Sequence, residues 1–259
     1  MLCCSAIHAA PVYNVTRFQT VLAGITKLEA SMLAAIGLLG GLLWAFLSIA
    51  DAVSEGDTKT WDTRILLLLR DPSNSALPWG PQWVQEMARD LTALGSVTVL
   101  TLLTAAVIGY LVLVRKRHAA LGVFIAITSG QILSTLLKAG FDRARPDIVP
   151  HGTVVYTASF PSGHSMMAAI TYLTLGALLA RVHGPRRTKV YLLTVALVLT
   201  GLVGISRVYL GVHWPTDVLA GWAVGATWAL LCAMVVRVLQ KYGQVEPPSR
   251  AVEDPPWTI

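Results

Sequence analysis

The chain has 259 residues, of which 54% are hydrophobic and only 13% are charged, and its mean hydropathy is +0.62. Because an average soluble domain has roughly 25% charged residues, this composition excludes an ordinary soluble protein. The net charge of +6 does not indicate a nucleic-acid partner, because the basic residues cluster at the ends of apolar blocks, as membrane topology signals do.

The two ends of the chain are predicted to lie outside the folded domain. Residues 1–27 lack the features of a signal peptide, and we expect them to form a cytoplasmic tail. Residues 244–259 contain two Pro-Pro pairs and are predicted to form a disordered tail. The domain between them covers residues 28–243.

Six apolar blocks follow one another along this domain, and a membrane span needs roughly 17–25 such residues. The blocks cover residues 28–50, 91–114, 119–137, 163–180, 190–205 and 216–236. The sequence therefore predicts an all-α fold, a bundle of six transmembrane helices. A bundle of five spans is the alternative, because the block at 190–205 is at the short limit.

The segment between the first two blocks, residues 51–90, has an amphipathic pattern of its own. One helical face of this segment is apolar and carries Trp61, Ile65, Leu68 and Leu69. Asp62 lies off that face. We therefore expect an additional amphipathic, interfacial helix that lies on the membrane surface or covers the mouth of the bundle. The pattern leaves open whether it only packs there or helps to admit substrate.

The charges of the short loops predict the orientation of the bundle. Two of these loops are basic, and they contain Arg115-Lys116-Arg117 and Arg186-Arg187. Because short loops rich in Lys and Arg stay in the cytoplasm, we expect both chain termini on that side of a plasma or inner membrane. The other three loops should then face outward.

Three segments on the predicted outer face hold most of the polar residues that a membrane bundle does not need. They are residues 138–146 after the third block, 161–164 at the start of the fourth, and 206–217 between the fifth and sixth. The first segment carries basic residues on the side that the topology rule keeps poor in them, and such residues usually have a chemical use. The loop charges thus predict a single polar site at the outer face.

The cations of these segments predict a phosphate site. Lys138, Arg145 and Arg207 outnumber the carboxylates available to pair with them, so an anion should occupy the space between them. Ser162 and Gly163 stand where the fourth helix begins, and their backbone N–H groups and the helix dipole should face the same anion. We therefore expect these residues to bind phosphate.

Two histidines and an aspartate predict the chemistry. Asp217 follows His213 by four residues, close enough to accept the Nδ1–H and leave Nε2 free to attack phosphorus. His164 would act as the general acid and then activate the water that hydrolyses the phosphohistidine. The sequence has no HExxH motif, and no carboxylate cluster or cysteine pair placed to hold a metal, so we expect no metal and no other cofactor.

The three segments match, letter for letter, the signature of the type 2 phosphatidic acid phosphatase superfamily. That signature is K-x6-RP, PSGH and SR-x5-H-x3-D, and it fixes eleven positions within residues 138–217. The resemblance implies a membrane-bound lipid phosphatase with His213 as the nucleophile, Asp217 as its partner and His164 as the acid/base. It also implies a set of phosphate ligands, which are Lys138, Arg145, Ser162, Gly163 and Arg207.

The predicted place of the site at the outer membrane surface makes a lipid the expected substrate. Candidates are undecaprenyl diphosphate, phosphatidic acid, phosphatidylglycerol phosphate and lipid A 1-phosphate. The alternatives are a lipid phosphotransferase with the same intermediate, a vanadium-dependent haloperoxidase, and a non-catalytic phospholipid transporter. Haloperoxidases are soluble, and a transporter would leave the histidines without a purpose. The sequence predicts neither the head group nor the oligomeric state.

Some residues near the motifs are expected to be structural. Asp142 and Arg143 lie at unconstrained positions of the first motif, and we expect a solvated or locally paired duo. Gly40, Gly41, Gly201 and Gly204 are expected to allow close packing of helices.

Overall fold

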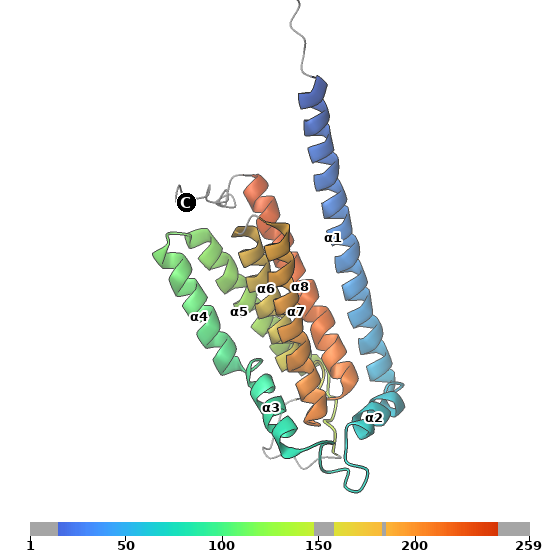
Figure 1. Ribbon diagram of the computed structural model, residues 1–259. Helices are drawn as coiled ribbons and strands as arrows, with labels where there is room; N and C mark the ends of the chain where they lie inside the picture. The colour runs from blue at the N-terminus through green and yellow to red at the C-terminus, as the bar shows by residue number, and fades with distance from the viewer. Residues whose placement is uncertain (1–14, 148–157, 183–184, 243–259) are drawn as a thin grey trace, which may run out of the picture. The chain divides into compact units, whose positions relative to one another are not determined.

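The computed structural model describes residues 15–147, 158–182 and 185–242, and in this part every regular element is an α-helix (Figure 1). The chain divides into two units, residues 1–38 and residues 39–259. The first unit is described only from Val15, where helix α1 begins. The all-α fold predicted from the sequence is confirmed.

Eight helices make up the described part of the chain. They are α1 Val15–Glu55, α2 Lys59–Leu68, α3 Gln82–Ala93, α4 Val97–Leu113, α5 Arg117–Gly140, α6 Gly163–Val182, α7 Arg186–Tyr209 and α8 Pro215–Lys241. The domain boundary expected after residue 27 falls within α1, and the tail expected at 244–259 lies outside the described residues. Both boundaries stay predictions.

Five of the described helices are long and apolar enough to cross a membrane, namely α1 from Ala30, α5, α6, α7 and α8. Helices α3 and α4 pass the same test only together, and they meet at a bend of 47°. The block expected at 91–114 is therefore not one straight helix. Ser96 caps α4 by accepting the Val99 N–H at 3.3 Å, which starts a new helix after the bend. The described chain thus has five candidate spans, or six if the bent pair is one span.

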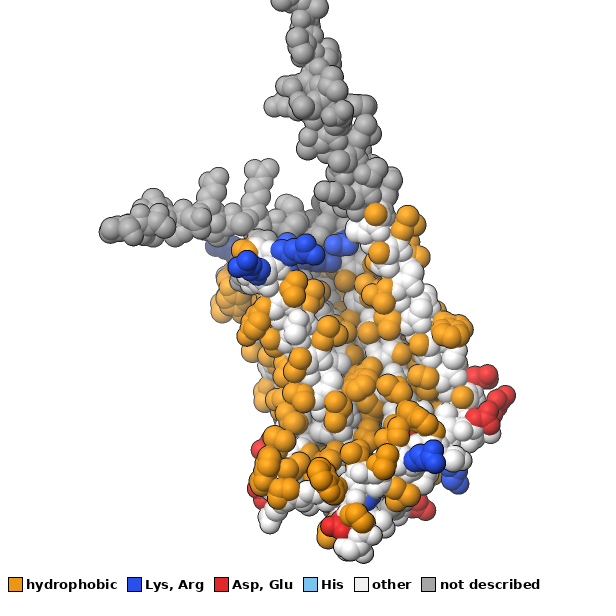
Figure 2. Space-filling model, turned by 45° about the vertical axis from the view of Figure 1, so that its right-hand side comes forward, with side chains coloured by type: hydrophobic (Ala, Val, Ile, Leu, Met, Phe, Trp, Pro, Cys, Tyr) orange, Lys and Arg blue, Asp and Glu red, His pale blue; other side chains and the backbone are white. Residues whose placement is uncertain are grey.

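Helix α6 is the centre of the bundle and contacts α4, α5, α7 and α8. Its apolar side chains are buried in the largest core cluster, with Met166, Ala168 and Ile170 at 0% exposure. Hydrophobic side chains also cover the outside of the helices, as expected of a surface that faces lipid (Figure 2). In the same view, several Lys and Arg side chains lie at the upper end of this surface, and others lie with Asp and Glu at the lower end.

Two glycines let α8 lie directly against α6. A Cβ added at Gly221 would lie 2.8 Å from the Ser162 carbonyl oxygen, and one at Gly225 would lie 2.6 Å from that of Met166. This G-x-x-x-G spacing is typical of membrane helices that pack backbone to backbone. It places the N-terminal ends of the two helices, and the residues they carry, side by side.

The glycines predicted for this role were mostly the wrong ones. A Cβ at Gly204 would indeed collide with the Trp222 ring, at 2.3 Å. A Cβ at Gly40, Gly41 or Gly201 would meet nothing within 4 Å, so no close helix packing depends on them. Adjacent glycines or a short spacing between them do not reveal which helix face a neighbour occupies.

The segment between the first two apolar blocks contains helix α2, where the sequence predicts an additional helix. Trp61 and Leu68 are 46% and 74% exposed, whereas Asp62 and Leu66 are fully buried. Leu66 packs against a small cluster that includes Trp214 at the start of α8. The helix packs through the face that carries Asp62, because this carboxylate has buried partners that the hydropathy pattern does not reveal.

Candidate active site

The α7–α8 turn places the predicted nucleophile next to its carboxylate partner. Gly211 adopts φ +74°, a conformation that favours glycine, and the chain then turns into α8. Asp217 lies in the first turn of α8, where its Oδ2 accepts the Trp214 N–H at 2.9 Å. This contact and the helix dipole both stabilise a carboxylate at that position.

His213 and Asp217 form a buried pair, with 1% and 0% side-chain exposure. His213 Nδ1 lies 3.4 Å from Asp217 Oδ2, and the Ser159 hydroxyl donates to the same oxygen. The other ring nitrogen, Nε2, lies 3.2 Å from Arg145 Nη1. Because a guanidinium can only donate, Nε2 is the unprotonated nitrogen and Nδ1 carries the hydrogen. This is the tautomer that the sequence predicted.

The protonation of His213 follows from its burial. Loss of hydration is the main cause that lowers the pKa of His213 to about 4, with Arg207 and Arg145 acting in the same direction and Asp217 opposing the shift. The imidazole is therefore neutral at physiological pH. A neutral ring with an unprotonated Nε2 is the form that a nucleophile needs.

The predicted phosphate ligands Lys138 and Arg207 lie within electrostatic reach of the His213–Asp217 pair. Lys138 leaves the last turn of α5 against Gly163, where an added Cβ would lie 3.3 Å from its Nζ. Arg207, in the last turn of α7, donates to the Thr92 hydroxyl at 3.1 Å, and its Nε has no hydrogen-bond partner among the described residues. Within the described chain no carboxylate forms an ion pair with Lys138 or Arg207. Such a cluster of cations favours an anionic ligand.

Ser162 and His164 lie at the N-terminal end of α6, beside the His213–Asp217 pair. His164 lies within electrostatic reach of Lys138, Arg207 and His213. The Ser162 N–H donates to the Asp217 carbonyl at 3.0 Å, so the expectation that it faces an anion is wrong. This backbone hydrogen bond joins the start of α6 to α8, so only the hydroxyl group of Ser162 remains to donate to a ligand. Its oxygen accepts from Ser165 Oγ at 2.9 Å.

Arg143 was missed by the sequence reasoning, which expected a solvated or locally paired side chain. It donates to Asp217 Oδ1 and to Asp62 Oδ2, both at 2.6 Å. Asp142 is exposed, as expected. The positive charge of Arg143 could have indicated its role, since it is a further cation in a loop predicted to be poor in basic residues.

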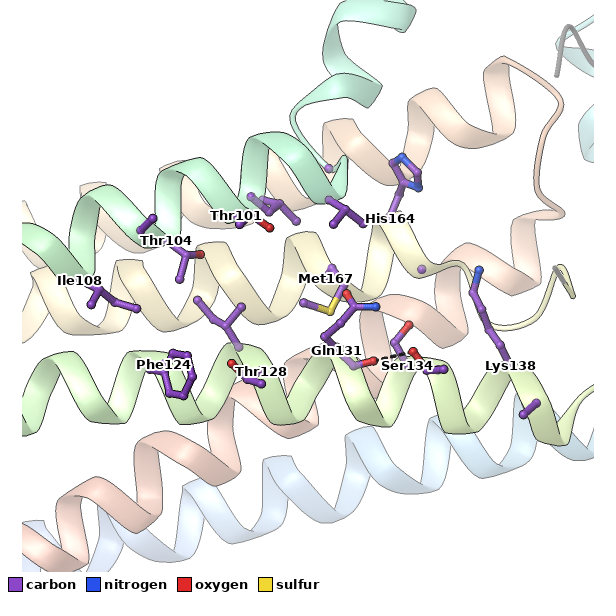
Figure 3. Close-up of a pocket in the computed structure, with 18 of the residues that line it drawn as sticks. Thr101, Thr104, Ile108, Phe124, Thr128, Gln131, Ser134, Lys138, His164 and Met167 are labelled. Atoms are coloured by element: carbon purple, nitrogen blue, oxygen red, sulfur yellow. Dashed lines mark hydrogen bonds between the residues drawn. The ribbon is translucent and has the colours of Figure 1, made fainter. Parts of the chain in front are cut away.

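A cavity of about 810 Å³ leads away from the cations between α4, α5 and α6. Lys138 and His164 lie at one end of it, and Ile108 and Phe124 lie at the other (Figure 3). Its lining is mostly apolar, with a few hydroxyl and amide groups. Gly95 lies beside His164 at the polar end.

A bundle of apolar helices that holds a buried histidine–aspartate pair beside several cations is the architecture of an integral-membrane phosphatase. The model of the PAP2 superfamily matches residues 118–241. Phosphatidylglycerophosphatase B of Bacillus subtilis (strain 168) is 34% identical over 189 residues, which are 70% of this chain and 85% of that protein. The chain therefore belongs to the PAP2 superfamily, and the resemblance seen in the sequence is confirmed.

Further relatives and a solved structure agree with this assignment. An undecaprenyl-diphosphatase of Sulfolobus acidocaldarius is 28% identical over 132 residues, which cover 48% of this chain and 60% of that protein. The crystal structure of a transmembrane PAP2-type phosphatidylglycerolphosphate phosphatase from Bacillus subtilis matches with a TM-score of 0.68 and 30% identity, over 79% of this chain and 98% of that chain. The protein is thus a membrane-bound phosphatase of the PAP2 lipid phosphatase family.

Proposed function

We propose that this phosphatase hydrolyses a lipid phosphomonoester or diphosphate through a phosphohistidine on His213, without a metal ion. The observation that carries the proposal is the orientation of the ring. Nδ1 faces the buried Asp217, while Nε2 faces the cations, 3.2 Å from Arg145 Nη1. A phosphate held by these cations would meet the lone pair of a neutral imidazole.

The proposed reaction has two steps. The Nε2 lone pair of His213 forms a bond to phosphorus while the bond from phosphorus to the leaving oxygen breaks, and His164 gives that oxygen a proton. A water molecule then attacks phosphorus, His164 takes its proton, and the phosphorus–nitrogen bond breaks to release inorganic phosphate. Lys138, Arg145 and Arg207, with Ser162 and Gly163, would stabilise the charge on the phosphoryl oxygens in both steps.

The cavity supports a lipid as the substrate. It begins beside Lys138 and His164 and continues between α4 and α5 along an apolar lining (Figure 3). A hydrocarbon chain that fills it would leave its phosphate among the cations, because the two regions are continuous. The names of the relatives favour phosphatidylglycerol phosphate and undecaprenyl diphosphate as the first substrates to test.

We also propose six spans, with α3 and α4 counted as one bent span, and both termini in the cytoplasm. The basic α4–α5 and α6–α7 loops support this orientation. The site would then open on the non-cytoplasmic face of the membrane. Helix α2 would lie at that interface, with Trp61 and Leu68 exposed to the headgroup region.

Phosphate release in detergent tests the reaction. The purified protein is assayed against phosphatidylglycerol phosphate, phosphatidic acid, lipid A 1-phosphate and undecaprenyl diphosphate, with and without EDTA. We expect release from at least one lipid and full activity in EDTA. Loss of activity on chelation contradicts the metal-free mechanism, and release only from soluble phosphomonoesters contradicts a lipid substrate.

A matched pair of variants tests the cavity. Ala105 lines it, whereas its neighbour Ala106 is exposed and does not. We expect Ala105→Phe to raise the KM for the lipid about tenfold, and to leave a short-chain phosphate unaffected, because only the long chain needs the filled space. Ala106→Phe should change neither. Equal KM values for all three proteins with the long-chain lipid contradict a chain-binding cavity.

A further inference from the structure

An ion-pair network joins helix α2, outside the expected spans, to the back of the His213–Asp217 pair. At its centre lies Arg143, whose Nη1 reaches Asp217 Oδ1 and whose Nη2 reaches Asp62 Oδ2, each at 2.6 Å. Both carboxylates have 0% side-chain exposure, and the guanidinium has 14%. The signature motif includes neither Asp62 nor Arg143.

Hydroxyl and backbone groups complete the network. The Thr216 hydroxyl donates to Asp62 Oδ2 at 2.6 Å and accepts from Arg143 Nη1 at 2.8 Å. The Thr216 N–H donates to Asp62 Oδ1 at 2.9 Å. The Thr58 hydroxyl, at the start of α2, accepts from Arg143 Nη2 at 3.0 Å. Asp62 thus accepts three hydrogen bonds, one of them from the backbone of the residue that precedes Asp217.

Arg143 is held by protein groups rather than left for a ligand. Its two Nη atoms donate four hydrogen bonds, and its guanidinium carbon lies 5.7 Å from the centre of the Trp214 ring. The Trp214 ring is fixed in turn, because its Nε1–H donates to the Ala144 carbonyl at 3.0 Å. Arg143 therefore differs from the neighbouring cations that face the anion site.

The geometry divides the oxygens of Asp217 between two tasks. Arg143 takes Oδ1, which leaves Oδ2 to Ser159, the Trp214 N–H and His213 Nδ1. A carboxylate held on both oxygens cannot rotate away from the imidazole. Without Asp62, the Nη2 group of Arg143 would lose its charged partner, and a two-point contact of the guanidinium with Asp217 would compete with the imidazole for that carboxylate.

The positive charge that forms on His213 is offset by the charges on the Nδ1 side of its ring only when Asp62 is counted among them. When Nε2 bonds to phosphorus, the imidazole keeps its Nδ1–H and gains a positive charge. Two carboxylates and one guanidinium give a net charge of −1 behind the ring, which offsets that charge in a site with little water. Removal of Asp62 would leave a net charge of zero in the same place.

We propose that Asp62 and Arg143 are positioning residues, which orient Asp217 and balance the positive charge that forms on His213. The proposal rests on the proposed function, because it needs a histidine that becomes phosphorylated. It assigns to α2 a direct effect on the rate of the chemical step. Neither residue touches the substrate, so substrate binding should not depend on them.

Asp62→Asn, which keeps the size of the side chain, tests the proposal. We expect kcat to fall about 10- to 100-fold, as for the loss of a hydrogen bond between charged groups, while KM changes less than about twofold. The inhibition constant of inorganic phosphate should stay unchanged, because the anion site is intact. Asp62→Glu, which restores the charge, should recover part of kcat.

Two variants of the same region serve as matched controls. Asp57→Asn removes an exposed carboxylate five residues earlier and should leave kcat at the wild-type value. Leu66→Ala loosens the packing of α2, because Leu66 is fully buried against Val208, Trp214 and Val218. It should lower the thermal midpoint of unfolding with a smaller effect on kcat than Asp62→Asn.

Each outcome decides the proposal. A wild-type kcat in Asp62→Asn overturns it, and so does a Leu66→Ala variant that reproduces the same fall in kcat at an equal loss of stability. If Asp62→Asn does not fold, Arg143→Lys takes its place, since it keeps the charge but cannot bridge two carboxylates. A wild-type kcat in Arg143→Lys overturns the proposal. Failure of the proposed function is a separate result, because His213→Ala would then release phosphate at the wild-type rate.

Discussion

The two sides of the His213 ring are built differently. On the Nδ1 side, Asp217 has hydrogen-bond partners for both oxygens and is fully buried. On the Nε2 side, Lys138 and Arg207 form no ion pair with a carboxylate of the described chain. The protein itself therefore completes the side that orients the nucleophile, whereas a bound anion would complete the side that receives the phosphate.

The largest effect should come from the orienting side. Asp217→Asn keeps the shape of the side chain but removes the charge that favours Nδ1–H and the cationic ring. We expect kcat to fall about 10³- to 10⁴-fold, as for the equivalent change in a serine protease triad. Steady-state phosphate release measures this fall in kcat. A smaller fall in Asp217→Asn than in Asp62→Asn would contradict the direct contact of Asp217 with His213 and the indirect role of Asp62.

A change on the receiving side should be smaller and should act on binding as well. Arg207→Lys keeps the charge but loses the planar fork that holds two phosphate oxygens. We expect kcat/KM to fall about 10- to 100-fold, with a weaker inhibition by phosphate. Since Asp217→Asn should leave phosphate inhibition unchanged, the two inhibition constants separate the two sides of the ring. Equal phosphate inhibition in both variants would remove that distinction.

The pH dependence reports on both sides at once. Burial and the cations lower the pKa of His213 to about 4, so the reactive neutral ring is present above that pH and lost below it. We expect the acidic limb of kcat/KM to fall near pH 4 rather than at the usual histidine value of about 6.5. Lipid monophosphates titrate near pH 6, so the limb is compared between a monophosphate and a diphosphate substrate. A shared limb near 6.5 would contradict a buried neutral histidine.

The smallest effect should come from the glycine beneath Lys138. In Gly163→Ala, the added Cβ would lie 3.2 Å from Lys138 Cε, and a flexible lysine chain can move by that amount. We expect a KM increase of about two- to fivefold with little loss of stability, in keeping with the small cost of moving a long side chain. Gly221→Ala is the contrasting variant, because its Cβ would meet a backbone oxygen at 2.8 Å. It should lower the thermal midpoint clearly, and equal stability of the two variants would contradict this difference.

Much of the fold and the motif positions could be predicted because they depend on local patterns. Apolar blocks gave the helices, and loop charges brought three separate motifs to one face. The close approach of Gly95 to Val203 and His164, at the bend between α3 and α4, was not predictable, because those residues belong to two other helices. Neither was the α6–α8 contact, because Gly221 and Gly225 become meaningful only once their neighbour is known.

The supporting part of the site was less predictable than its motif. Asp62 and Arg143 are separated by 81 residues, and nothing local distinguishes a buried ion pair from two solvated charges. Hydropathy places Asp62 off the apolar face of α2 and does not reveal that it is buried, since a buried carboxylate is the exception that only its partners explain. The Ser162 N–H was assigned to an anion because it begins a helix, and tertiary structure gave it to the Asp217 carbonyl instead.

The central claim is that His213 carries the phosphoryl group, and a quenched single-turnover experiment tests it most directly. The purified protein is mixed with a lipid substrate labelled with ³²P in the scissile phosphate, denatured in alkali within the first turnover, and digested. We expect a label on the peptide that contains His213, stable in alkali and lost in acid, and no label in His213→Ala. Phosphate release at the wild-type rate by His213→Ala, or a label on another residue, would contradict it.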